Sequence, residues 1–134
     1  MGEALTTENP TENLIREYGR LNSLWTAAEK QLADLNTPVE CYHIFECKED
    51  GDCHLERMLG WVKFRNKWKL CLGCRVVEQD EFWWCPVLEC SIDDRVEAVE
   101  AFPEVRRKLE SETAGFLIEV RLAADSLSNY VKHF

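Results

Sequence analysis

The residues with the most obvious capacity for chemistry are seven cysteines and three histidines in a chain of 134 residues. Cys71-Leu72-Gly73-Cys74 has the two-residue spacing of a zinc knuckle, in which a tight turn brings two thiolates to one ion. Cys85 and Cys90 could supply a second pair of ligands. The sequence therefore raises a zinc-stabilised small domain, held by these four cysteines, as one alternative.

An extended backbone around the same thiols argues against a metal site. Cys71 and Cys74 lie within the alternating apolar pattern of a strand, where residues three apart point to opposite faces. The four residues between Cys85 and Cys90 include Pro86-Val87-Leu88, which also favours a strand. Because unpaired thiols behave as small hydrophobic side chains, we expect free core cysteines and no bound cofactor, with zinc as the exception to test.

Nucleophilic catalysis has little support. Cys53 and His54 are adjacent, but neighbours in a strand point apart, whereas a Cys–His pair needs side-chain contact and a third, orienting group. The chain contains no G-x-S-x-G, phosphate-loop, H-E-x-x-H or dinucleotide-binding motif. We therefore expect a protein that is not an enzyme.

The segment 60–70 combines basic and aromatic side chains in a chain that is otherwise strongly acidic. Its basic residues are Lys63, Arg65, Lys67 and Lys69. Together with Trp61 or Trp68 they could follow a phosphate backbone and stack on bases, so weak nucleic-acid binding is a second alternative. The same pattern is typical of a β-hairpin whose lysines face solvent while its aromatic residues enter the core.

The register of this hairpin decides which aromatic side chain is exposed. A two-residue loop at Arg65-Asn66 pairs Trp61 with Leu70, whereas a three-residue loop pairs Val62 with Leu70. A slip of one residue moves every side chain to the other face of the sheet. The sequence leaves open whether Trp61 or Phe64 faces solvent.

Three successive aromatic residues follow two acidic ones in Asp80-Glu81-Phe82-Trp83-Trp84. Neighbouring side chains of a strand point to opposite faces, so the three rings cannot all enter one core. Tryptophan is enriched at binding hot spots. Trp83 and Trp84, beside Asp80 and Glu81, are therefore candidate contacts for a basic protein, unless Trp83 is covered by a helix.

The elements that would position these residues form an α+β pattern. Asn9-Pro10-Thr11-Glu12 has the features of a helix start, and apolar residues at steps of three and four continue the helix to about residue 35. The strand candidates are 39–47, 53–64, 67–77 and 82–88. Pro86 places the last strand at a sheet edge, and Ser91 opens a short helix that Pro103 interrupts.

After Pro103 an apolar series keeps a helical period for about 30 residues. Its members are Val105, Leu109, Phe116, Val120, Ala123, Leu127 and Val131. The predicted architecture is an antiparallel four-stranded meander sheet packed against long N-terminal and C-terminal helices, in the order α-β-β-β-β-α-α. Residues 1–8 are expected to be a flexible polar N-terminus and residues 9–134 a single α+β domain, whose long helices could pair with each other or support self-association.

The formal charge of −9 comes from the two ends of the chain, because residues 41–79 carry seven basic and six acidic side chains. An acidic surface repels nucleic acid and suits basic protein partners. No apolar run approaches the ~20 residues that span a bilayer, and an odd cysteine count without an export signal indicates a reducing, cytoplasmic location. The sequence predicts a non-catalytic acidic interaction module, an adaptor or inhibitor that binds a basic macromolecular partner.

Overall fold

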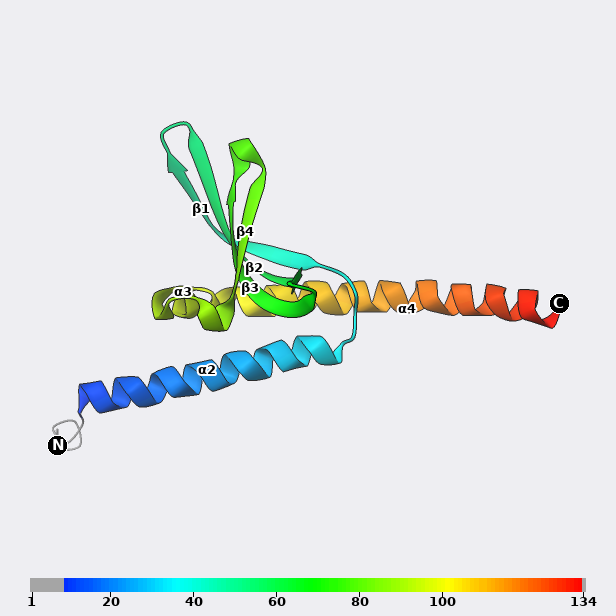
Figure 1. Cartoon of the computed structure of the whole chain (residues 1–134), viewed down its shortest axis with the longest axis horizontal. Coiled ribbons are helices and arrows are strands. Elements are labelled where there is room, and N and C mark those ends of the chain that lie inside the picture. Colours follow the sequence, from blue (N-terminus) through cyan, green and yellow to red (C-terminus); the bar gives the residue numbers. More distant parts are fainter. Residues whose placement is uncertain (1–8, 134) are drawn as a thin grey trace.

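The computed structural model describes residues 9–133 of the chain, except the side chain of Asp50, and has the α+β architecture that the sequence predicts (Figure 1). The expectation for residues 1–8 lies outside these described residues. The elements are α2 (Pro10–Asp34), β1 (Cys41–Asp50), β2 (Cys53–Phe64), β3 (Lys67–Val76), η1 (Val77–Gln79), β4 (Glu81–Pro86), η2 (Val87–Glu89), α3 (Ile92–Glu97), η3 (Val99–Ala101) and α4 (Phe102–Lys132). The strands form one antiparallel sheet in the order β1-β2-β3-β4, which confirms the predicted meander.

The helix starts follow the capping chemistry expected from the sequence. The Asn9 side chain accepts hydrogen bonds from the backbone N–H groups of Thr11 (3.0 Å) and Glu12 (3.3 Å) at the start of α2. The Ser91 hydroxyl accepts one from the N–H of Asp94 (3.2 Å) at the start of α3. None of the helices in the described part of the chain is long and apolar enough to cross a bilayer.

The β2–β3 hairpin has the two-residue loop. Trp61 lies opposite Leu70 and Lys63 opposite Trp68. Arg65 and Asn66 form the loop with φ angles of 50° and 67°, as a type I′ turn requires. In this register Trp61 is only 2% exposed, so the structure resolves the ambiguity by placing Trp61 in the core.

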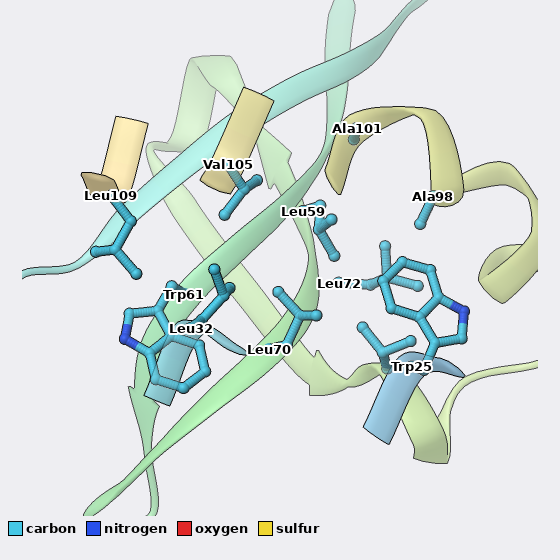
Figure 2. Packing of buried hydrophobic residues seen from close by; sticks show 11 residues of the cluster. Trp25, Leu32, Leu59, Trp61, Leu70, Leu72, Ala98, Ala101, Val105 and Leu109 are labelled. Carbon is cyan, nitrogen blue, oxygen red and sulfur yellow. The ribbon is translucent and has the colours of Figure 1, made fainter. Parts of the chain in front are cut away.

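The core lies between one face of the sheet and the helices (Figure 2). The sheet contributes Leu59, Trp61, Leu70 and Leu72. From α2 come Trp25 and Leu32, and from the segment after α3 come Ala98, Ala101, Val105 and Leu109. The residues after α3 are spaced by three and four, and so are those of α2 once the partly buried Leu21, Ala28 and Leu35 are included, so one apolar stripe on each side of the chain covers the sheet.

The opposite face of the sheet is covered by its own aromatic side chains. Tyr42 on β1 contacts Phe82 and Trp84 on β4, with ring centroids 5.8 and 6.2 Å apart, although both strands are sheet edges. The Trp84 ring lies over Gly60 and Gly73, where a Cβ atom would come within 2.9 and 2.5 Å of it. The missing side chains of these glycines therefore let Trp84 lie flat against the two central strands.

The long helix α4 is buried only near its start. Val105 and Leu109 are fully buried, whereas the predicted core series is exposed from Phe116 onward. Trp25 meets Phe102 in an edge-to-face contact at 6.4 Å, but α4 then runs on past the sheet and past the end of α2 (Figure 1). The sequence left open whether the long helices pair with each other or extend beyond the sheet; α2 and α4 meet at the Trp25–Phe102 contact, and the rest of α4 extends beyond the sheet.

Candidate functional site

The two adjacent tryptophans of β4 occupy opposite faces of the sheet. Trp84 lies opposite Gly73, is partly buried and stacks on Phe82 at 6.0 Å. Trp83 lies opposite Cys74, on the face that carries the helices, and is 50% exposed. Trp84 thus has a structural role in covering the central strands, and Trp83 is the tryptophan that is free to meet another molecule.

A shallow pocket of about 220 Å³ adjoins the Trp83 ring. Trp83 lines it together with Arg57, Cys85, Cys90 and Asp94. The Trp83 ring stays half exposed although Asp94 of α3 lines the same pocket. The pocket is therefore open, with an aromatic wall on one side and a carboxylate on the other.

The charge around this pocket is predominantly negative. The Arg57 guanidinium bonds to three carboxylates, those of Glu46 (3.2 Å), Asp94 (2.7 Å) and Glu97. The hydrogen bond to Glu97, with the one to Glu46, raises the pKa of Arg57, while the Arg57 bond lowers the pKa of Glu46. Lys48 is the other base in contact with Glu46, at 3.5 Å. The three carboxylates therefore outnumber the two cations that contact them. Asp94 and Glu97 remain accessible to a cation from another molecule.

The two acidic residues that precede the aromatic run lie at the start of β4. Asp80 has a φ of 51° and accepts a 2.8 Å bond from Arg75, which also lies over the Phe82 ring. Glu81 is the first residue of the strand and is exposed. Asp80 is thus partly neutralised within the chain, and Glu81 adds a free carboxylate two residues from Trp83.

The basic hairpin does not join this site. Trp61 is buried and stacks on Trp68 at 6.1 Å, so it is unavailable as the exposed contact that the sequence allowed. Lys69 lies 3.6 Å from Glu29, which leaves Lys63, Arg65 and Lys67 exposed at the tip. The tip at Lys67 is seven residues from Cys74 along β3, or about 23 Å at ~3.3 Å per residue. The expected binding residues therefore fall into two separate surfaces.

The cysteines are dispersed. Cys71 is fully buried on one face of β3 and Cys74 faces the other, as the alternation predicts. Among residues 9–133 no three side chains of the metal-ligating types come together, so Cys71, Cys74, Cys85 and Cys90 do not form the candidate zinc site. Burial raises the pKa of Cys71 to about 12, and burial with the neighbouring Cys85 does the same for Cys90.

One ion pair in the structure was not predicted from the sequence. Glu78, in η1, accepts a 2.9 Å bond from the backbone N–H of His54 and also pairs with the His54 ring. These bonds lower the pKa of Glu78 to about 2, and the carboxylate raises the pKa of His54. The two residues are 24 positions apart, and no spacing rule connects them. The pair links the start of β2 to η1, which follows β3 directly.

The His54–Glu78 pair should give stability a defined pH dependence. Glu78 contributes above its ordinary pKa of 4.5 and loses that contribution as pH falls toward 2, while His54 contributes below its ordinary 6.5 and loses it as pH rises through its raised value. The pair therefore stabilises most between about pH 4.5 and 6.5.

In a His54→Ala variant we expect the Glu78 pKa, followed by NMR, to rise only part of the way to 4.5, because the backbone bond remains. An unchanged Glu78 pKa would contradict this pairing. The control is Glu49→Gln, which removes the carboxylate 3.4 Å from the other ring nitrogen of His54 and should leave both bonds between His54 and Glu78 in place.

Comparison of the chain with protein-family models, with curated proteins and with solved structures finds no match. A function can therefore be inferred only from the geometry of the chain itself.

Proposed function

We propose that this protein is a non-catalytic interaction module, an adaptor or inhibitor, that binds a basic protein partner through Trp83. The observation that carries this proposal is a half-exposed tryptophan on an edge strand, beside a surplus of carboxylates. Tryptophan buries a large area for a small loss of conformational freedom, and it is among the residues that dominate binding energy.

The chemistry of the pocket suits an arginine or lysine side chain. A cation lying against the Trp83 ring gains about 0.5–2 kcal/mol from the ring's electron density. The same cation would lie close to Asp94, whose carboxylate shares Arg57 with two others. Since one guanidinium serves three carboxylates, a second cation lowers the repulsion among them.

Access to Trp83 needs no rearrangement of the sheet. β4 pairs only with β3 among the described strands, so its outer edge is open and a partner can approach Trp83 from the side.

The two alternatives from the sequence have weaker support. The hairpin tip offers three exposed basic residues without an exposed tryptophan, and within residues 9–133 the four cysteines of the zinc hypothesis do not form a group that could hold a metal ion.

The test is affinity purification from a native lysate with the tagged chain and a Trp83→Ala variant. We expect the wild type to retain basic proteins in a salt-sensitive manner, and Trp83→Ala to weaken the strongest by about 30-fold, as the loss of one hot-spot tryptophan predicts. Asp94→Asn should weaken the same protein to a smaller extent.

The matched control is Ile15→Ala, which removes an exposed apolar side chain in the first half of α2. It should leave the retained basic proteins unchanged. A Trp83→Ala variant that keeps the same proteins at the same salt concentration would refute Trp83 as the contact. Retention of no basic protein by the wild type would refute the proposed partner class.

A further inference from the structure

The apolar stripe of α4 continues without change of phase beyond the part that the sheet covers. Val105 and Leu109 belong to the buried part. The exposed continuation comprises Phe116, Val120, Ala123, Leu127 and Val131, with Leu117, Ala124 and Tyr130 beside them. The residues of the stripe remain three and four positions apart, so all of them lie on one side of the helix. We call residues 116–132 the distal segment of α4.

The apolar side of the distal segment is not packed against any other part of the described chain. Its 17 residues extend about 25 Å, past the sheet and past α2 (Figure 1). A helix of this length is marginal in water unless its apolar face packs against another surface. Contiguous apolar surfaces of this kind mark sites of protein association.

We propose that a second copy of this chain covers the distal segment, in an antiparallel pair of α4 helices whose two-fold axis passes near Ala123 and Ala124. Ala123 lies midway along the stripe and Ala124 lies beside it, and their small side chains let two helices approach closely. An antiparallel pair centred there sets Phe116 of one copy opposite Val131 of the other, and Val120 opposite Leu127. One surface thus serves both copies, as a two-fold interface requires.

The charge of the distal segment is compatible with a second copy at this place. The distal segment carries two acids, Glu119 and Asp125, and two bases, Arg121 and Lys132. All four lie off the stripe. Two chains of formal charge −9 repel each other, but this neutral segment adds no net charge to the contact between them.

A pocket at the near end of the distal segment extends the proposed interface onto the body of the protein. Phe116 lines this cavity of about 350 Å³ together with Pro38, Trp61 and Trp68. In the antiparallel pair the last turn of the partner helix reaches the level of Phe116. Tyr130, 73% exposed, is the large side chain that this turn carries, and it would enter the pocket of the opposite copy.

Sedimentation over a range of micromolar concentrations tests the pair with two matched leucine variants. Leu127 and Leu122 are 61% and 63% exposed, but Leu122 lies on the other side of the helix from the stripe. We expect the wild type and Leu122→Glu to dimerise. Leu127→Glu should weaken the dimer by at least ~100-fold, because each copy then buries an unpaired carboxylate. A monomeric wild type, or a Leu127→Glu dimer of unchanged affinity, would overturn the proposal and leave another protein as the occupant.

A charge pair tests the orientation. Val120→Lys and Leu127→Glu should each be monomeric alone and should form a heterodimer when mixed, because the antiparallel pair sets position 120 of one copy opposite position 127 of the other. In a parallel pair position 120 meets position 120, so absence of a heterodimer would overturn the antiparallel arrangement. Near-ultraviolet circular dichroism, which reports Trp25 and Trp61, should stay unchanged because neither substitution touches the core. Trp83→Ala should dimerise as the wild type does, so this test is independent of the proposed function.

Discussion

Replacing Trp61 with alanine is expected to lower the free energy of unfolding by about 3–5 kcal/mol, the usual range for removing a buried tryptophan. Trp61 is 2% exposed, lies opposite Leu70 and stacks on Trp68. Removing its ring would leave a cavity between the sheet, α2 and α4, where rigid strand neighbours cannot close in. Urea unfolding, followed by circular dichroism, measures the loss.

Two variants keep this expectation falsifiable if Trp61→Ala does not fold. Trp61→Phe retains most of the apolar volume and should lose clearly less stability than the alanine variant is expected to lose. Trp83→Ala removes the same side chain from a half-exposed position and should cost no more than about 1 kcal/mol. Equal losses for the phenylalanine variant of Trp61 and the alanine variant of Trp83 would refute the assignment of Trp61 to the core.

Gly73→Ala is expected to destabilise the protein by about 1–3 kcal/mol, although it adds a single methyl group. The new Cβ would lie 2.5 Å from Cζ3 of Trp84 and 3.0 Å from Cγ of Met58. Met58 is fully buried, and Trp84 is held by Phe82 and Tyr42, so neither neighbour can move away freely. Thermal and urea unfolding should both report the loss.

Gly19→Ala is the matched control, because nothing lies within 4 Å of its added Cβ in the interior of α2. It should stabilise the protein by about 0.5–1 kcal/mol, opposite in sign to Gly73→Ala. In a Trp84→Leu background the cost of Gly73→Ala should fall, since the clashing ring is gone. An undiminished cost in that background would show that the contact with Trp84 is not the cause.

Local chemistry made most of the fold predictable. The Asn9 side chain caps α2 as its position before Pro10 indicated, and the alternation of Leu70 and Leu72 marked the core face of β3. Pro86 ends an edge strand because it has no N–H to donate. Each of these features depends on residues close in sequence, where capping, periodicity and turn rules apply.

Features that depend on distant residues, or on an unusual local backbone conformation, were not predictable. The hairpin register required two adjacent residues with positive φ, Arg65 and Asn66, and arginine gives little indication of that conformation. Strand alternation separates Trp83 from Trp84 but does not state which of the two meets a glycine-lined surface. The helical period identified the apolar side of α4. The length of that side that the sheet buries, which ends before Phe116, depends on where the sheet lies.

The helices that cover the sheet come from segments before it and after it in the chain. This order affects how the chain can fold as it is synthesised. Each strand pairs with its neighbour in sequence, so the meander needs only short loops to close. Leu59 and Leu72, however, stay uncovered on one side until Ala98, Val105 and Leu109 have left the ribosome. An unfinished chain therefore presents an apolar sheet surface, the kind of surface on which chaperones act and from which aggregation starts.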